Sequence, residues 1–187
     1  MQLEQSLDYN LFLRTIAGYD RIPKSRHILT FIDLAKPSSV ERLFVIDMKE
    51  MEILYSTYVT HGINSGELYA TSFSNEKGSL MTAPGFYLTE NSYTGRNGYS
   101  MILEGLERGI NHRIKNRGIV MHSAPYAHPS VIDSLGYLGH SEGCPAIPEY
   151  ISETIIDAIK DSTILYIHTR DTDYFRNTTF IPERYLN

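Results

Sequence analysis

Seven runs of β-branched, aromatic and other apolar residues recur along the chain, and each is short enough to be a strand rather than a helix. They cover residues 28–34, 43–48, 53–60, 85–89, 99–103, 118–122 and 163–168. The stretches 61–66, 72–78 and 91–98 between them are rich in Gly, Asn and Ser, which tolerate positive φ or hydrogen-bond their own backbone. The pattern therefore predicts a β-rich protein whose strands are joined by polar turns.

Three segments carry a helical spacing of apolar residues instead. Residues 7–17 do so loosely before Gly18 and Pro23 interrupt them, which predicts an N-terminal capping helix within residues 1–22. A second helix is predicted from the three- and four-residue steps between Leu103, Leu106, Ile110 and Ile114. Pro148 suits the first turn of a third helix, whose apolar face carries Ile151, Ile155, Ile156 and Ile159.

Length and composition fit one ordinary globular domain. The chain has 187 residues, of which 42% are hydrophobic and 21% charged, so intrinsic disorder is excluded. A chain of this size can bury roughly 70% of its unfolded surface. We therefore expect a single domain over residues 1–187 that is mainly β, a β-sandwich or closed barrel with a few short helices.

The charge distribution argues against a nucleic-acid partner and a polybasic membrane anchor. Lys and Arg number 17 against 22 Asp and Glu, a net charge of −5, and the basic residues are scattered along the chain. No apolar run approaches the ~20 residues of a transmembrane helix, and residues 1–20 lack the basic start and apolar centre of a signal peptide. An exported form is expected to need a leader that this numbering does not contain.

The candidate chemistry lies in residues 119–148. His122 ends an apolar strand, so its ring is expected to emerge from a rigid part of the core. Cys144, the only cysteine and hence a free thiol, follows Ser141, Glu142 and Gly143 in a turn where glycine leaves the backbone amides unshielded. A thiolate nucleophile needs a base and an oxyanion site, and this segment offers both.

Two other interpretations stay open from the spacing alone. A lone cysteine is often a small buried apolar residue, and a histidine at a strand end is often only a hydrogen-bonded core residue. Zinc is the second alternative, with the ligands His122, His128, His140 and Cys144. Because no H-E-x-x-H or paired C-x-x-C motif accompanies them, no metal and no cofactor is predicted.

The segment resembles the active-site region of the L,D-transpeptidase (YkuD-type) family, and most closely its murein L,D-transpeptidase catalytic domain-like subgroup. The family's S-H-G-C-x-R motif and upstream His-Gly or His-Ser pair correspond to Ser141, Gly143, Cys144, His122 and Ser123. The subgroup's G-R-S-x-G-C-P-A-x-P run is matched by Gly139, Ser141, Gly143, Cys144, Pro145, Ala146 and Pro148. Other matches are V-x-H-G-x-N-S-G at 59–66, F-S-N-x-x-G-S at 73–79, G-F-Y at 85–87, Y-T-G-x-x-G at 93–98, L-x-G-L at 103–106 and R-x-I-V at 117–120.

The resemblance implies a β-rich, cysteine-dependent L,D-transpeptidase that acts on peptidoglycan stem peptides through a thioester acyl-enzyme. It makes Cys144 the nucleophile and His122 the base, oriented by the backbone carbonyl of Ser123, with amides around Gly143 and Cys144 holding the oxyanion. Transfer to an amine gives a cross-link and transfer to water gives L,D-carboxypeptidase activity; a catalytically inactive murein-binding relative is the other alternative. The resemblance also implies a covalent adduct with carbapenems and a place in the cell envelope, periplasmic or exported.

Three positions depart from the family's pattern. Glu142 replaces the second His of the common motif, Ala146 replaces an Arg or Asn, and Ser123 replaces the subgroup's Gly. Arg96, Arg113 and Arg117 are candidate replacements for the missing polar group, each with a solvated surface charge as the alternative. The predicted substrate-binding residues are Ser141, His61, Tyr126 and Arg96, with a solvent-exposed turn histidine as the alternative for His61; Tyr87 and Tyr93 also lie near candidate cleft loops.

Overall fold

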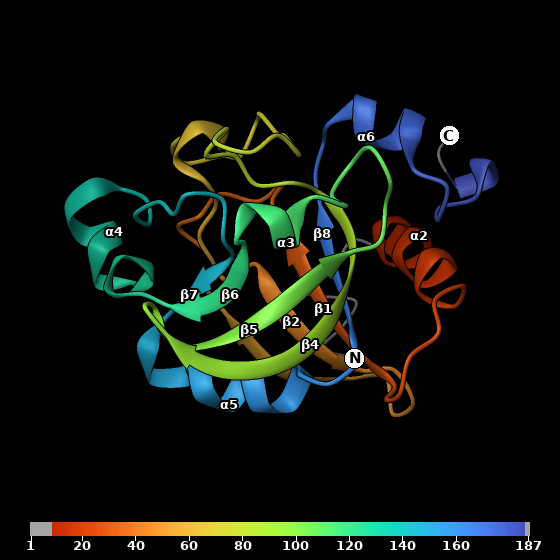
Figure 1. Ribbon diagram of the computed structural model, residues 1–187, viewed down its shortest axis with the longest axis horizontal. Helices are drawn as coiled ribbons and strands as arrows, with labels where there is room; N and C mark the ends of the chain where they lie inside the picture. Colours follow the sequence, from red (N-terminus) through yellow and green to blue (C-terminus); the bar gives the residue numbers. More distant parts are fainter. Residues whose placement is uncertain (1–8, 186–187) are drawn as a thin grey trace.

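The computed structural model describes residues 9–185 and is built on one eight-stranded mixed sheet (Figure 1). In sheet order the strands are β3 (Glu52–Thr57), β2 (Leu43–Asp47), β1 (Ile28–Asp33), β8 (Ile164–His168), β4 (Gly85–Gly95), β5 (Gly98–Gly105), β6 (Val120–Ser123) and β7 (Ala146–Ile147). Neighbouring strands are antiparallel except for the parallel pairs β1–β8 and β6–β7. Each of the seven predicted runs overlaps a strand, and only the two-residue β7 was not predicted.

The two edges of the sheet approach each other, so the sheet is nearly closed. Beyond β3 the backbone continues along the β7 edge, where Thr60 N donates to Ala146 O at 2.9 Å. Gly62 then forms a parallel bridge with Ser141, and Ser141 N donates to His61 O at 3.1 Å. The prediction of a mainly β fold is confirmed, and the closure favours a barrel over a two-sheet sandwich.

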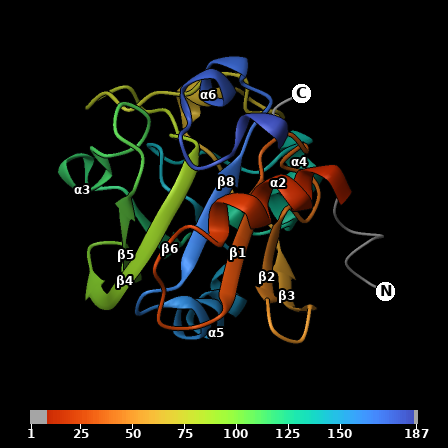
Figure 2. The ribbon, with the colours of Figure 1, turned by 90° about the vertical axis from the view of Figure 1, so that its right-hand side faces the viewer.

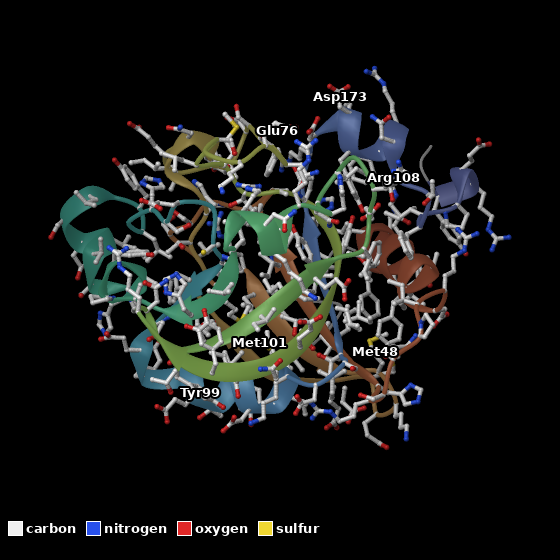
Figure 3. The ribbon with its side chains drawn as sticks, in the orientation of Figure 1. Met48, Glu76, Tyr99, Met101, Arg108 and Asp173 are labelled. Carbon is white, nitrogen blue, oxygen red and sulfur yellow. The ribbon has the colours of Figure 1, made fainter. Side chains whose placement is uncertain are left out.

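The central strands β1 and β8 are buried on both faces, and their alternate residues enter different cores. Leu165 and Ile167 join an interior cluster that includes Met101 of β5, labelled in Figure 3. Ile164 and Tyr166 join a second cluster on the other face, which α2 (Tyr9–Tyr19) and α6 (Thr172–Asn177) cover (Figure 2). Burial on both faces explains why these strands read as nearly continuous apolar runs.

Two of the three predicted helices are confirmed. Helix α2 matches the N-terminal prediction, although residues 1–8 of the predicted range lie outside the described residues. Helix α5 (Glu149–Ile159) follows Pro148, which occupies the N-cap position. Three isoleucines of its predicted apolar face, Ile155, Ile156 and Ile159, are fully buried in the interior cluster. Figure 1 shows α5 covering the lower end of the sheet.

The helix predicted over residues 103–114 is wrong. Leu103 belongs to β5, and within residues 103–114 only Ile114 is helical, as the first residue of α3 (Ile114–Arg117). The Asn111 side chain takes over part of the backbone hydrogen bonding, because its oxygen accepts from Glu107 N at 2.9 Å. A Cβ added at Gly105 would lie 2.0 Å from Asn111 O, so this close turn requires glycine. Leu103 and Ile114 are both buried in the interior cluster, but they reach it from separate elements.

The remaining differences concern short elements. The stretch 91–98, predicted as a turn, is mostly strand, because β4 runs to Gly95 and β5 begins at Gly98. The short helices were not predicted because they span too few residues for a periodic pattern; they are η1 (Ile63–Ser65), η2 (Pro125–Ala127), α4 (Ser130–Leu135), α6 and η3 (Glu183–Tyr185). Every helix of the described residues is too short or too polar to cross a membrane.

Candidate active site

The β6–β7 pairing sets the backbone next to the candidate nucleophile beside the strand that carries the candidate base. The parallel register sets His122 opposite Ala146, so Cys144, two residues earlier, approaches Val120. The Val120 backbone lowers the pKa of the Cys144 thiol, and both residues belong to the interior cluster. Val120 and His122 are two residues apart in one strand and therefore face the same side of the sheet. The backbone of Cys144 therefore lies opposite the position two residues before His122 in β6.

His122 has a defined tautomer. Its Nδ1 lies 2.8 Å from the backbone oxygen of Ser123, and because a carbonyl only accepts, Nδ1 carries the proton. Nε2 is then unprotonated in the neutral ring and can accept a proton. Burial lowers the pKa of His122, while its hydrogen bond to Ser123 O acts in the opposite direction. A neutral imidazole with a proton-accepting Nε2 is the form that a general base requires.

The turn before Cys144 depends on glycine and serine. Gly143 has a φ of +120°, and a Cβ there would lie 2.7 Å from Met81 O. Ser141 Oγ accepts from Gly143 N at 3.1 Å and donates to Cys144 O at 2.7 Å. The buried Ser141 hydroxyl therefore supports the turn from within and engages the Gly143 amide. A substrate contact of Ser141 and an oxyanion role of Gly143 stay predictions.

Thr82 also supports the nucleophile turn, and sequence reasoning did not identify it. Its hydroxyl accepts from Gly62 N at 2.9 Å and donates to Gly143 O at 3.3 Å. A Cβ added at Gly62 would lie 3.0 Å from the Gly143 Cα, so the two backbones are in direct contact. Nothing in the sequence marks this threonine, because its partners are distant backbone atoms.

The surroundings of Cys144 favour the neutral thiol. Burial raises the pKa of Cys144, the Val120 N–H and the positive charge of Arg117 lower it, and the negative charge of Glu142 raises it further. Only 8% of the residue is exposed. Glu142 itself is exposed, as predicted from its type and place in a tight turn. The raised pKa therefore keeps the Cys144 sulfur protonated at neutral pH.

Tyr126 is a substrate-binding candidate whose hydroxyl is affected by the charges of Cys144 and Glu142. Its ring packs against a small cluster formed by Ala124, Ala127 and Ala146. Burial, together with the charges of Cys144 and Glu142, raises the pKa of Tyr126 to about 12. The half-buried phenol is therefore a neutral hydrogen-bonding group beside the thiol.

His61 lies in the interior and not in solvent or at a cleft. It is 0% exposed, and both of its ring nitrogens are engaged. Nδ1 accepts from Arg42 Nη2 at 2.8 Å, and Nε2 donates to Gly66 O at 2.9 Å. Arg42 is fully buried and also donates to Val59 O at 2.8 and 3.0 Å. The solvent-exposed alternative for His61 is therefore wrong, and its contacts shape the 61–66 turn, which packs on the nucleophile turn. A substrate contact of His61 stays a prediction.

The three candidate arginines have different positions. Arg96 is exposed at the tip of the β4–β5 hairpin, and Arg113 forms an exposed ion pair with Glu76. Arg117 is half-buried, and its guanidinium lies beside Gly143. Arg96 and Arg113 are therefore exposed charges, whereas Arg117 packs against the nucleophile turn. A substrate contact of Arg96 stays a prediction.

The two candidate cleft tyrosines also differ in their exposure to solvent. Tyr87 is buried and donates its hydroxyl to Ala83 O at 2.7 Å, so it does not line a cleft. Tyr93 is 40% exposed on β4.

The structure does not gather the ligands of the zinc alternative. His128 Nδ1 contacts Ser130 Oγ at 2.7 Å, and His140 Nε2 lies 3.0 Å from Glu67 O. Across residues 9–185, no group of three or more His, Cys, Asp or Glu side chains is arranged to hold a metal ion.

The chain belongs to the L,D-transpeptidase catalytic-domain family, whose model matches residues 3–168. Solved structures with the same fold include the helical cell shape determining protein Pgp2 from Campylobacter jejuni, with 12% identity and a TM-score of 0.51 over 87% of this chain and 56% of that one. An L,D-transpeptidase from Mycobacterium smegmatis has 14% identity and a TM-score of 0.48 over 76% and 59%. The L,D-transpeptidase LdtMt1, solved in complex with imipenem, has 15% identity and a TM-score of 0.45 over 76% and 59%.

This chain thus spans between about half and 60% of the length of these solved relatives. Among curated proteins, the sequence has no match.

Proposed function

We propose that the protein is a cysteine-dependent L,D-transpeptidase that acts on peptidoglycan stem peptides through a thioester acyl-enzyme. Membership of the catalytic-domain family supports the reaction class. The observation that carries the assignment of residues is the Nδ1–H to Ser123 O hydrogen bond, which leaves His122 Nε2 as the acceptor on the strand that contacts Cys144. We also propose that the protein works in the cell envelope, periplasmic or exported, where this substrate is found.

In the proposed acylation, His122 Nε2 removes the thiol proton while the Cys144 sulfur attacks the carbonyl carbon of an L,D-peptide bond. The oxyanion that forms is held by backbone N–H groups, with Cys144 N–H as the proposed donor because Ser141 engages the Gly143 amide. The carbon–nitrogen bond then breaks, and the imidazolium gives its proton to the leaving amine. The product is a thioester on Cys144 and a released amine.

The acceptor decides the outcome of the second half-reaction. An amine of a neighbouring stem attacks the thioester, passes a proton to His122, and leaves a new amide and the thiol. Water in the same position gives a carboxylic acid, which is L,D-carboxypeptidase activity. We propose transfer to an amine as the main reaction and hydrolysis as the alternative.

The decisive experiment is incubation with purified tetrapeptide muropeptides followed by mass analysis of the products. A cross-linked dimer supports transpeptidation, a trimmed tripeptide supports carboxypeptidase activity, and unchanged substrate supports an inactive murein-binding relative. Cys144→Ala and His122→Ala should each abolish most turnover, and the double variant should lose little more, because paired catalytic groups act as a unit. His128→Ala, at an exposed histidine, is the matched control.

A carbapenem provides a second test that needs no muropeptide. One solved member of the family was obtained in complex with imipenem, and we propose the same class of acyl donor as a partner of this protein. Intact-mass analysis should find the added mass on the wild-type protein and on His128→Ala, and not on Cys144→Ala. An adduct that persists on Cys144→Ala would remove Cys144 from the mechanism.

A further inference from the structure

Arg117 connects the nucleophile turn to a loop that is distant in sequence. It is the last residue of α3, and Gly118, at a φ of 71°, then turns the chain into β6. The Arg117 Nη1 donates to Ser74 O at 2.6 Å, and its Nη2 donates to Met81 O at 2.5 Å. Nη2 also lies 3.3 Å from Ser79 Oγ. The planar guanidinium thus binds both ends of the 74–81 loop, which a single ammonium could not do with the same geometry.

The same guanidinium lies against the turn that carries Cys144. A Cβ added at Gly143 would lie 3.1 Å from Arg117 Nη2 and 2.7 Å from Met81 O. Gly143 therefore packs directly on the Arg117–Met81 hydrogen bond. A shift of either partner would move the residue that precedes the nucleophile.

The charge of Arg117 is not neutralised by a contacting carboxylate. Its three hydrogen-bond acceptors are two backbone carbonyls and a hydroxyl. None of the ion pairs formed among residues 9–185 includes Arg117. The loop's carboxylate, Glu76, pairs with Arg113 on the exposed upper side of the molecule, where Figure 3 labels it. A half-buried cation is therefore left beside the Cys144 turn.

The charges of Arg117 and Cys144 each shift the pKa of the other group. The positive charge of Arg117 lowers the pKa of the Cys144 thiol, and a negative Cys144 raises the pKa of Arg117 against the effect of burial. Partial burial limits the screening of this interaction by salt. The interaction strengthens only when the sulfur becomes negative, so it favours the charged form that precedes attack.

We propose that Arg117 is a positioning residue that acts through Cys144. Its two guanidinium nitrogens hold the 74–81 loop against Gly143, and its positive charge stabilises the thiolate formed when His122 takes the proton. This inference rests on the proposed role of Cys144 as the nucleophile. It gives a role to a residue 27 positions upstream of Cys144 (144 − 117), whereas Ala146, two positions after the cysteine, carries no polar side chain.

The test compares Arg117→Lys, which keeps the charge but not the two-pronged guanidinium, with Arg117→Met, which removes both. Arg113→Met is the control, because it removes an equal charge at the exposed N-cap of α3, where Arg113 pairs with Glu76. Iodoacetamide labelling of Cys144 over a pH series reports the thiolate. The midpoint should rise by about one pH unit in Arg117→Met, stay within about 0.3 unit of wild type in Arg117→Lys, and not move in Arg113→Met. Hydrogen exchange of residues 74–82 should become faster in both Arg117 variants, because each lacks the two-pronged guanidinium.

Two results would overturn the inference. An unchanged labelling midpoint in a folded Arg117→Met protein would remove the charge effect, and wild-type exchange rates in Arg117→Lys would remove the positioning effect. If Arg117→Met fails to fold, Arg117→Lys still decides: a midpoint more than one unit above wild type would show that a cation here does not suffice. Failure of the proposed function is distinguishable, because it appears as full turnover or carbapenem adduct in Cys144→Ala, whatever the Arg117 variants do.

Discussion

The His122 ring is oriented by the backbone of Ser123, the next residue in the same strand, through a hydrogen bond of 2.8 Å between Nδ1 and the carbonyl oxygen. The carbonyl belongs to β6, which pairs with β5 on one side and β7 on the other, so the sheet fixes its direction. Orientation of the proposed base therefore needs no third side chain. A backbone role for this residue is compatible with either Gly or Ser after the histidine, the two residues that the resemblance gives for this position.

This relationship predicts a small effect of the Ser123 side chain. Ser123→Ala and Ser123→Gly should each keep kcat/KM within about tenfold of wild type, less than the 10²–10⁴ effect of a positioned acid or base. Muropeptide turnover measures this, with His122→Ala as the reference for complete loss. If Ser123→Ala were as inactive as His122→Ala, the hydroxyl and not the carbonyl would orient the ring.

The sequence predicted the strands well because their signal is local. In β1 and β8 nearly every residue is buried, so burial alone produces the apolar runs. The prediction failed at 103–114, where Leu103 and Ile114 fill one core from two different elements at a spacing that imitates a helix. The hydrophobic period alone cannot distinguish this arrangement from a helix, because the Asn111 side chain that ends the pattern acts through hydrogen bonds to Pro84 O and Phe86 O, which are distant in sequence.

The candidate site was predictable only where its sequence signal is local. The motif located His122 and Cys144, and the strand register then set the backbone of Cys144 beside the strand that carries His122. The supports of the nucleophile turn come from Thr82, Gly62 and Arg117, whose contacts are to backbone atoms far away in the chain. Such contacts leave no pattern in the sequence, so Arg117 could not be told from a surface charge before the fold was known.

The position of Glu142 predicts a modest effect on the thiol. Its negative charge raises the pKa of Cys144, but burial is the larger cause, and Glu142 is exposed. Glu142→Gln should therefore move the pH midpoint of iodoacetamide labelling downward by a fraction of a unit, and high salt should reduce the shift. Glu149→Gln, at an exposed acidic residue beyond the turn, is the control. An unchanged or higher midpoint in Glu142→Gln would show that this carboxylate does not oppose the thiolate.

The buried His61 predicts a loss of stability in acid. Burial and the neighbouring Arg42 lower the pKa of His61 to about 4, whereas the unfolded chain has the ordinary value of 6.5. Between pH 6.5 and pH 4 His61 is protonated in the unfolded chain and neutral in the folded protein, so the free energy of unfolding decreases as the pH falls towards 4. The integrated loss is about 3 kcal/mol in the free energy of unfolding.

His61→Gln tests this, because an amide can accept from Arg42 and donate to Gly66 O without titrating. Urea denaturation between pH 7 and pH 4 should show wild type and variant converging as the pH falls. His128→Gln, at an exposed histidine, should follow the wild-type curve. Parallel curves for wild type and His61→Gln would mean that this histidine does not control the acid response.

Glu107 is the buried carboxylate that joins the C-terminal segment to the sheet, and its removal should be strongly destabilising. Oε1 accepts from Phe86 N at 2.8 Å and from Tyr174 OH at 3.1 Å, and Oε2 accepts from Thr178 Oγ1 at 2.5 Å. Burial raises the pKa of Glu107, and these hydrogen bonds hold it down.

Glu107→Ala would leave three buried donors without their acceptor and should cost about 3 kcal/mol in the free energy of unfolding. Glu107→Gln keeps an acceptor for Phe86 N and Tyr174 OH and places its amide against the Thr178 hydroxyl, so it should lose no more than about 1 kcal/mol. Glu104→Ala, which removes a half-exposed carboxylate 3.7 Å from Lys115, should stay within about 0.5 kcal/mol of wild type. Urea denaturation compares the variants, and hydrogen exchange in α6 should accelerate most in Glu107→Ala, because that helix loses its buried attachment. A Glu107→Ala protein as stable as Glu104→Ala would show that the hydrophobic cluster alone holds α6 on the sheet.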